Sequence, residues 1–413
     1  GLGDVYKRQH PTSGFGRTEK RPFSANSIAR RMKSSSCIRL PYEGRTILHT
    51  RFLALRAFKS QILSQTIVTR IACIINPNAR DGKVGRNFHK VEESLKSSGI
   101  DYEIFMTTGK GHAIEISSDL RESDYDLVVA VGGDGTVHEV ANGIRGSDMR
   151  LGVIPMGNGD DFARSIGIPL NDIEGAISIL KQGVDYSVGG IRVEGLRAPD
   201  YPGIPSPKHY PVTGTPSSEE NLVRWSFLEC DGGVTSSINR MKDEGQFSWI
   251  SGQKKYTFLA IKAILGWKSQ LAWIKVDDNP GRKVDLTGLF AMMQAETFGG
   301  GYQVAPGMHP FGDSSKIVLG FGLTKSQMLR VMGPLEKGKH VGKWGKITME
   351  SCKNFEINAL DKNGNPTKEH GHDPPLFISL DGEISMTTPV KFDFHANVLN
   401  VRGGTNPPNV VKN

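Results

Sequence analysis

The chain has 413 residues and a formal net charge of +8, and 37% of its residues are hydrophobic. This length accommodates two domains with substantial cores, and no stretch approaches the ~20 apolar residues of a membrane-spanning helix. Residues 1–70 hold 14 of the 51 basic side chains but only three of the 43 acidic ones, so the remaining 343 residues are slightly acidic. The sequence therefore excludes a basic folded domain, argues against a nucleic-acid partner, and favours a soluble or peripheral protein.

The first seventy residues differ in character from the rest. The string "DVYKRQ" at 4–9 matches the translation of a transposon end used to fragment sequencing libraries, which makes Met32 the candidate start. Glu43 is the only acid between Met32 and Arg70, and "TRFLALRAFKSQILSQ" can form a basic amphipathic helix, as in organelle transit peptides. For 1–70 a mitochondrial leader and a disordered, partly spurious extension both remain open. The predicted location is cytoplasmic or peripheral membrane, with mitochondria as the alternative.

Strand-like and helical patterns alternate from Ile71 to about residue 190. Apolar runs at "IACII", "DYEIFM", "YDLVVAV" and "GVIP" are separated by helical spacing, as in "GRNFHKVEESLKSSG", where Gly99 is the predicted C-cap. Further helices are predicted at "GHAIEISSDLRES", "TVHEVANGI" and "DIEGAISILKQG". Alternation of this kind predicts a parallel sheet covered by helices.

The pattern changes after residue 190. A Pro- and Ser-rich stretch marks residues 191–220 as a linker or insertion. Mostly strand-like segments occupy 221–402, interrupted by one predicted helix around "KKYTFLAIKAILGW", and 403–413 form a tail. The second half is therefore predicted to be an antiparallel β domain.

The stretch "VVAVGGDGTVHEVANGI" places a carboxylate among glycines where a strand becomes a helix. Gly132 and Gly133 allow close approach to a ligand, and the amides at the start of the helix near Thr136 attract phosphate. Asp134 would repel a phosphate unless a divalent cation lay between them, as Mg²⁺ does in nucleotide sites. An N-cap role for Asp134 is the structural alternative.

Two other loops follow predicted strands of the same sheet. One carries Asn76 and Arg80, and the other carries Gly157, Asn158 and Gly159 followed by two acids. Open α/β folds bind ligands at the carboxyl ends of their strands. The three loops together therefore indicate a phosphate-binding site.

As a set, "NPNARDG", "VVAVGGDGTVHEVANGI", "GVIPMGNGDDFARSIGIP", "GGGYQVAPG" and "SLDGE" resemble the diacylglycerol kinase catalytic family. That family includes bacterial lipid kinases and relatives of sphingosine and ceramide kinases. The resemblance runs from about residue 71 to 401. It implies an α/β plus β fold, with a Rossmann-like three-layer nucleotide domain followed by an antiparallel β-sandwich domain that takes the lipid acceptor.

The resemblance also implies an ATP-dependent lipid kinase that uses Mg²⁺. Glu383 of "SLDGE" is implied as the general base, and Asp134 is expected to hold Mg²⁺ through the nucleotide phosphates. The remaining implied nucleotide contacts are Asn76, Pro77, Asn78, Ala79, Arg80, Thr107, Gly132, Gly133, Gly135, Thr136, Glu139, Gly157, Asn158 and Gly159. From the residues alone, Asp381-Gly382-Glu383 is equally consistent with a hairpin turn.

The chain departs from the family pattern at several positions. Asn158 and Asp160 stand where the family has threonine and asparagine, and Asp160 adds a negative charge beside the expected phosphate. Val234 and Ser236 depart from an "N-x-x-G-x-G-x-D-A" pattern. Only Asp313 represents the acidic "D-D-G" of a structural metal site, so a second metal there is a weak expectation.

Diacylglycerol is the leading predicted acceptor, and a sphingoid base, ceramide or monoacylglycerol follows. The expected partner is a lipid at a membrane surface, because the helix around Phe258 to Trp267 combines apolar side chains with lysines. The same helix could instead pack on its own sheet. A homodimer, an NAD kinase and a catalytically weak lipid-binding relative remain open, the last motivated by Asp160, Val234 and Ser236.

Overall fold

The computed structural model describes residues 70–79, 82–198, 221–250, 253–368 and 376–409. All of these residues belong to one compact unit, residues 57–413. Residues 1–69 of the predicted leader and 199–220 of the predicted linker lie outside the described residues, whereas Arg70 begins a strand and residues 191–197 belong to another.

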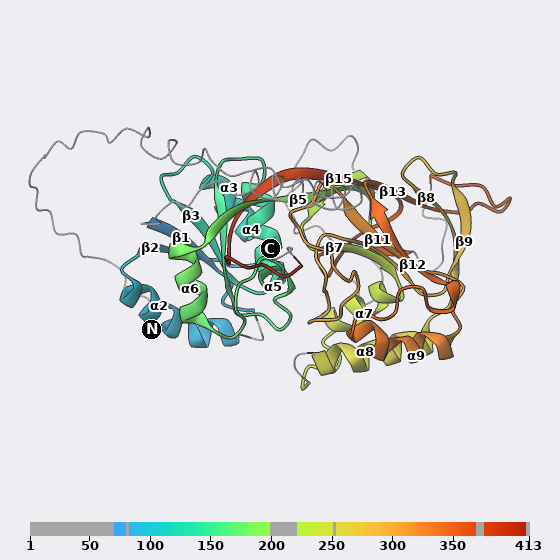
Figure 1. Ribbon diagram of the computed structural model, residues 1–413, viewed down its shortest axis with the longest axis horizontal. Coiled ribbons are helices and arrows are strands. Elements are labelled where there is room, and N and C mark those ends of the chain that lie inside the picture. Colours follow the sequence, from blue (N-terminus) through green and yellow to red (C-terminus); the bar gives the residue numbers. More distant parts are fainter. Residues whose placement is uncertain (1–69, 80–81, 199–220, 251–252, 369–375, 410–413) are drawn as a thin grey trace, which may run out of the picture. The chain divides into compact units, whose positions relative to one another are not determined.

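Four parallel strands form the first part of the fold (Figure 1). Their order is β2-β1-β3-β4, with β1 at Arg70–Ile75, β2 at Asp101–Met106, β3 at Leu127–Gly132 and β4 at Arg150–Pro155. Alternate residues of β1 face opposite sides of the sheet, so that Ile71 and Cys73 pack in one cluster and Ala72 and Ile74 in another. Helices cover both faces, which confirms the predicted three-layer α/β domain.

Two helices pack on one face of this sheet and three on the other. The first pair is α2 (Lys83–Ser98) and α6 (Ile173–Gln182), and the second group is α3 (His112–Asp119), α4 (Asp134–Ile144) and α5 (Asp161–Ser165). Helix α2 ends as predicted, because Gly99 takes φ 72° as its C-cap. Val91 and Leu95 of this helix are fully buried.

The second part is a sandwich of two sheets that share β15 (Glu383–Gly403). One sheet has the order β12-β11-β10-β7-β14-β15, and in the other β15 lies between β5 and β13. The remaining strands are β5 (Val184–Arg197), β6 (Asn221–Ser226), β7 (Glu229–Gly233), β8 (Gln270–Val276), β9 (Arg282–Leu286), β10 (Leu289–Met293), β11 (Ser315–Gly320), β12 (Ile347–Cys352), β13 (Asn354–Ala359) and β14 (Phe377–Leu380). Their shared core includes Phe290, Phe355 and Phe392, and it confirms the predicted antiparallel β-sandwich.

The expectation of a single helix in this part was wrong. Helices α7 (Val234–Asp243), α8 (Gln253–Gly266) and α9 (Lys325–Glu336) pack against the outer face of β10 and β11. Gly233, with φ 92°, turns the chain from β7 into α7. Thr324 and Gln327 form a capping box that starts α9. The start of α9 could have been predicted from the capping-box residues in the sequence. Helix α7 is short and polar, and its sequence does not indicate a helix.

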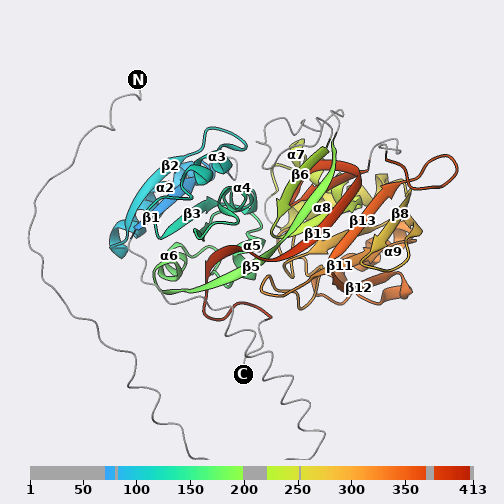
Figure 2. The ribbon, with the colours of Figure 1, turned by 90° about the horizontal axis from the view of Figure 1, so that it is seen from above.

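Strands β5 and β15 run through both parts (Figure 2). The beginning of β15 pairs with β14 in the sandwich, and its end pairs with β4 through Asn400 and Val401. The last residues of the predicted β domain are therefore part of the α/β sheet. One continuous strand links Glu383 to the strand that precedes the Gly157 loop.

Candidate active site

The turn from β3 into α4 brings three segments into close contact. Gly133 is the N-cap of α4 and no side chain caps the helix, so the N-cap role considered for Asp134 is wrong. A Cβ on Gly133 would lie 3.0 Å from Cα of Gly157, and one on Gly135 would lie 3.2 Å from Oε1 of Glu383. The glycines therefore let the second loop and the predicted base approach the start of the helix.

Asp160 shapes the loop that follows β4. Its backbone is left-handed, with φ 52°, a conformation that Asn and Asp adopt more readily than other non-glycine residues. Its Oδ1 accepts a hydrogen bond from the Gly157 amide at 2.8 Å. Asp160 can therefore adopt the backbone conformation and accept the loop hydrogen bond that the family's asparagine could provide. Its charge stays beside the expected phosphate, so the predicted cost in nucleotide affinity stands.

Two further carboxylates converge on this loop. Oδ1 of Asp134 accepts from the Phe162 amide at 3.0 Å. Asp161 accepts from the Thr297 hydroxyl at 2.7 Å and from the Gly300 amide at 2.8 Å, which ties the loop to the "GGGY" segment. Surrounding protein atoms desolvate Asp134 and, together with the charge of Asp161, raise its pKa to about 7.

This environment of Asp134 fits a cation. A carboxyl group whose pKa is raised by neighbouring acids is stabilised in its charged form when a positive ion binds. The described residues contain no group of three His, Cys, Asp or Glu side chains able to hold a metal. Mg²⁺ would thus be held by Asp134 together with nucleotide phosphates, for which the glycine loops leave a cradle. Asp313 is exposed and does not line the cavity, so the structure does not bring it to this site.

The turn that carries Glu383 is held by Asp381. Its carboxylate accepts hydrogen bonds from the Ser226 hydroxyl (2.5 Å), from Nδ1 of His138 (2.5 Å) and from the amides of residues 227–229 (2.9–3.2 Å). Burial alone would raise the pKa of Asp381, but His138 and these donors hold it below the ordinary value. Burial would likewise lower the pKa of His138, and Asp381 raises it instead.

His138 was missed by the sequence reasoning. It lies one turn after Asp134 on α4, so its ion pair with Asp381 joins the phosphate-loop helix to the turn before Glu383. The hairpin interpretation of Asp381-Gly382-Glu383 is compatible with this geometry, because the turn both reverses the chain and positions an acid. Oε2 of Glu383 lies 2.9 Å from Nζ of Lys110.

The ion pair between His138 and Asp381 predicts that Asp381→Asn changes stability in a pH-dependent way. The lowered pKa of Asp381 stabilises the fold above its unfolded pKa, and this contribution is lost as pH falls through the folded value. The raised pKa of His138 stabilises the fold below its unfolded pKa, and this contribution is lost as pH rises through the folded value. The variant should therefore lose roughly 3 kcal/mol of unfolding free energy between about pH 4 and 6.5, and less at pH 9. Urea unfolding at pH 5.5 and 9 tests this, and equal losses at both would contradict it.

The other predicted residues lie around this centre. Thr107 is buried after β2, and its amide donates to the Ile75 carbonyl at 2.9 Å. Glu139 accepts from the amides of Gly111 (2.9 Å) and Ala113 (3.2 Å) and so caps the start of α3. In this structure Glu139 thus holds the loop that carries Lys110.

The first loop forms a turn directly after β1. Oδ1 of Asn76 accepts from the Asn78 amide at 3.1 Å, and its carbonyl accepts from the Ala79 amide at 3.2 Å. Ala79 lines the same cavity as Gly133 and Gly157. Arg80 lies outside the described residues.

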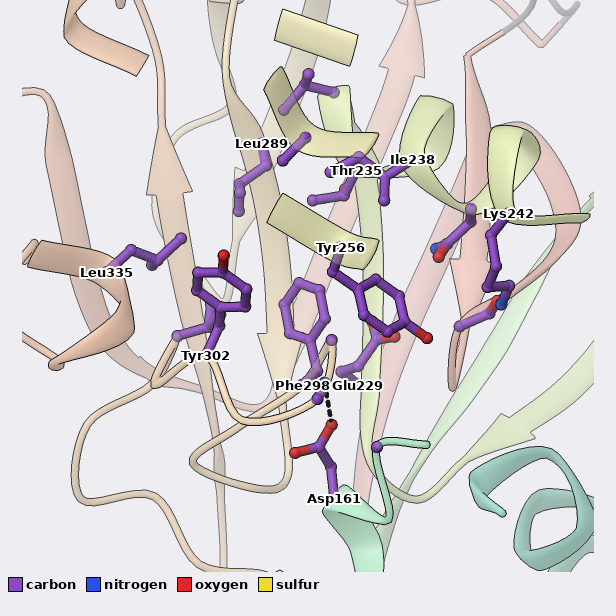
Figure 3. Close-up of a pocket in the computed structure, with 18 of the residues that line it drawn as sticks. Asp161, Glu229, Thr235, Ile238, Lys242, Tyr256, Leu289, Phe298, Tyr302 and Leu335 are labelled. Atoms are coloured by element: carbon purple, nitrogen blue, oxygen red, sulfur yellow. Dashed lines mark hydrogen bonds between the residues drawn. The ribbon is translucent and has the colours of Figure 1, made fainter. Parts of the chain in front are cut away.

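The glycine loops open into a cavity of about 420 Å³ (Figure 3). Its polar end contains Asp134, Gly157, Asn158 and Glu383. Its remaining wall is mostly apolar and comes from α7, α8, α9 and β10, and it includes Ile238, Tyr256, Ile264, Leu289, Met332 and Leu335. Val234 lines this wall, while the Ser236 hydroxyl donates to the Gly233 carbonyl at 2.7 Å within α7.

The fold and the site define a class of proteins in which the glycine loops of an α/β sheet lie beside a β-sandwich with an apolar cavity. The Diacylglycerol kinase catalytic domain matches residues 70–191, and the YegS C-terminal NAD kinase beta sandwich-like domain matches residues 230–403. These two matches confirm the resemblance to the diacylglycerol kinase catalytic family that the motifs predicted. This is a family of phosphotransferases with an alcohol group as acceptor.

Named relatives agree with this assignment. A diacylglycerol kinase of Mycobacterium tuberculosis (strain CDC 1551 / Oshkosh) is 23% identical over 66% of this chain and 80% of its own length. A diacylglycerol kinase of Bacillus subtilis (strain 168) is 36% identical, but the match covers only 28% of this chain and 39% of that relative. A crystal structure of a diacylglycerol kinase from Bacillus anthracis str. Sterne has a TM-score of 0.56 at 17% identity, covering 84% of this chain and all of that one, which shows a shared fold.

Proposed function

We propose that this chain transfers the γ-phosphate of ATP to the hydroxyl of a lipid alcohol, with diacylglycerol as the leading acceptor and phosphatidic acid as the product. One observation carries the proposal: a single cavity joins the glycine loops and Glu383 to an apolar chamber. A phosphate donor needs the first environment and acyl chains need the second. A nucleotide acceptor such as NAD would have little use for the apolar chamber.

The residues around the cavity suit in-line phosphoryl transfer. A neutral lipid hydroxyl is a weak nucleophile, so a base must take its proton as the oxygen bonds to the γ-phosphorus and the bond to ADP breaks. Glu383 is the carboxylate that approaches Gly135 from the β-sandwich, and Nζ of Lys110 lies beside it. Mg²⁺, when bound with the nucleotide, supplies charge neutralisation at the phosphates.

A screen of lipid acceptors tests the proposal. The purified chain would be incubated with radiolabelled ATP, Mg²⁺ and mixed micelles of diacylglycerol, monoacylglycerol, a sphingoid base or ceramide, with NAD in a parallel reaction. We expect labelled phosphatidic acid or another lipid phosphate, identified by chromatography. Phosphorylation of NAD alone would overturn the lipid assignment. The absence of both products together with undetectable binding at millimolar Mg·ATP would favour the catalytically weak alternative.

Helix α8 supports access to a membrane-held acceptor. Part of the helix packs inward, since Leu259, Ala263 and Ile264 are buried. Apolar side chains also remain on its surface, with Phe258 48% and Leu265 57% exposed. The exposed Lys254, Lys262 and Lys268 lie on or directly after this helix. Exposed apolar side chains interleaved with lysines favour the surface of an anionic bilayer, and no described helix is long and apolar enough to cross one.

Leu265→Asp should weaken binding to anionic vesicles. The substitution places a charge where a bilayer would cover an apolar side chain, so we expect about a tenfold loss in the partition coefficient. Cosedimentation with vesicles of phosphatidylcholine and phosphatidylserine measures it. Leu271→Asp on β8 is the matched control, because Leu271 is 62% exposed and lies outside α8. Equal losses in both variants would argue against α8 as the contact surface.

A further inference from the structure

Two acidic side chains on β7 are buried on the same face of the sandwich. Glu229 and Asp231 are two residues apart, so they point to one side of the strand, while Cys230 points into the sandwich core. Glu229 is 1% exposed and Asp231 is 0% exposed. In the sheet, Asp231 lies between Ala291 of β10 and Ser379 of β14.

The two carboxyl groups lack the partners that buried charges normally have. Oε2 of Glu229 and both oxygens of Asp231 are buried without a well-formed hydrogen bond to any described residue. The Gly382 amide near Glu229, and the Thr235 hydroxyl and Lys242 near Asp231, favour the charged forms but do not outweigh burial. Burial, and then the charge of Asp231, raise the pKa of Glu229 well above its ordinary value, and burial raises the pKa of Asp231 to about 6. Two buried carboxyl groups this close do not readily both ionise, so the pair favours a state in which they share a proton. Burying such a group without well-formed hydrogen bonds is costly, which is typical of binding sites.

Of the two acids, Glu229 lines the cavity and Asp231 does not. Glu229 lines the cavity together with Thr235, Asn239 and Lys242 of α7 (Figure 3). Nζ of Lys242 donates to the carbonyl of Gly382 at 2.7 Å, and Gly382 directly precedes Glu383. A lipid with its acyl chain in the chamber and its hydroxyl at Glu383 would pass its remaining polar atoms beside Glu229.

We infer that Glu229 and Asp231 form a head-group subsite for acceptors that carry a second hydrogen-bond donor next to the phosphorylated hydroxyl. This inference rests on the proposed lipid kinase function. A second hydroxyl, an amide N–H or an ammonium group would donate to Oε2 of Glu229, and Asp231 would act through Glu229. The ester oxygens of diacylglycerol only accept hydrogen bonds and leave the buried charge uncompensated. The subsite therefore favours monoacylglycerol-like or sphingoid-like acceptors, which reverses the order of acceptors suggested by the family resemblance, where diacylglycerol comes first.

Two lipids that differ by one hydroxyl test this directly. The first is 1-oleoylglycerol, and the second is the oleoyl ester of 1,3-propanediol, which lacks the hydroxyl at carbon 2. With the full chain we expect kcat/KM to be about 10- to 100-fold higher for the glycerol ester, the range of a hydrogen bond to a charged group. Equal values for the two lipids would overturn the inference. Failure to phosphorylate any lipid would instead overturn the proposed function.

Variants separate a binding role from a structural one. Glu229→Gln and Asp231→Asn keep the side-chain shape but remove the shared proton and the charge. Each should reduce the preference for the glycerol ester to less than threefold, through KM for the lipid, while KM for ATP stays unchanged. Asp278→Asn is the control, since Asp278 is exposed and does not line the cavity. Should both variants keep the full preference, or raise both KM values equally, the carboxyl pair has no head-group role.

Discussion

Glu383→Gln should lower kcat by about 10² to 10⁴, the usual contribution of a general base. Glutamine fills the same space beside Gly135 but cannot accept the proton of the lipid hydroxyl. Because the nucleotide loops are untouched, KM for ATP should change little. Steady-state kinetics with radiolabelled ATP at saturating lipid measures the effect.

The control for this variant is Glu194→Gln. Glu194 pairs with Arg192 on β5, and its side chain is 40% exposed and absent from the cavity. Its replacement should leave kcat within twofold of the wild type. Wild-type turnover in Glu383→Gln would show that Glu383 is not the general base and that the turn has a structural role.

Asp134→Asn should abolish activity and stabilise the fold at the same time. Asparagine can still accept the Phe162 amide hydrogen but cannot bind Mg²⁺ as a carboxylate does, so turnover should fall by several orders of magnitude. The raised pKa of Asp134 means that its ionised form destabilises the folded protein at any pH above the unfolded pKa. The variant should therefore unfold at a higher temperature at pH 8, and the gain should shrink towards pH 4.

Activity assays and thermal unfolding at pH 4, 6 and 8 test both parts. In the wild type, Mg·ATP binding should weaken as pH falls below about 7, because Asp134 becomes protonated. In Asp134→Asn, the affinity for Mg·ATP should no longer change with pH below about 7. Unchanged turnover in the variant would contradict the Mg²⁺ role, and an unchanged melting temperature at pH 8 would contradict the desolvated carboxylate.

Local patterns allowed much of the α/β part to be predicted. The helical spacing of Val91 and Leu95 and the glycine at 99 define α2, and the glycines around Asp134 mark a strand-to-helix turn. Such signals are read from neighbouring residues in the sequence. The lipid acceptor, in contrast, rested on resemblance, since nothing in the local pattern of Glu383 distinguishes a base from a hairpin residue.

Contacts between distant residues explain what the sequence reasoning missed. His138 and Asp381 are 243 positions apart and meet only because β15 returns to the first sheet. Glu229 and Asp231 were not singled out from the sequence, because their burial depends on strands β10 and β14, which are distant in the sequence and pair with β7 only in the fold. In the sequence, Asp160 was only a departure from the family's asparagine. In the structure, its left-handed backbone and its hydrogen bond from the Gly157 amide give it a structural role.

The continuity of β15 makes the geometry of the centre sensitive to strand length. Glu383 is at one end of this strand and the contact with β4 is at the other, so the length of the strand fixes the spacing between Glu383 and the loop that follows β4. Two register irregularities interrupt its ladder with β5, near Thr387 and near His395. Losing or gaining a single residue between them would turn every later side chain to the opposite face. Substitutions in β15 should therefore disturb the site less than insertions or deletions that change the length of the strand.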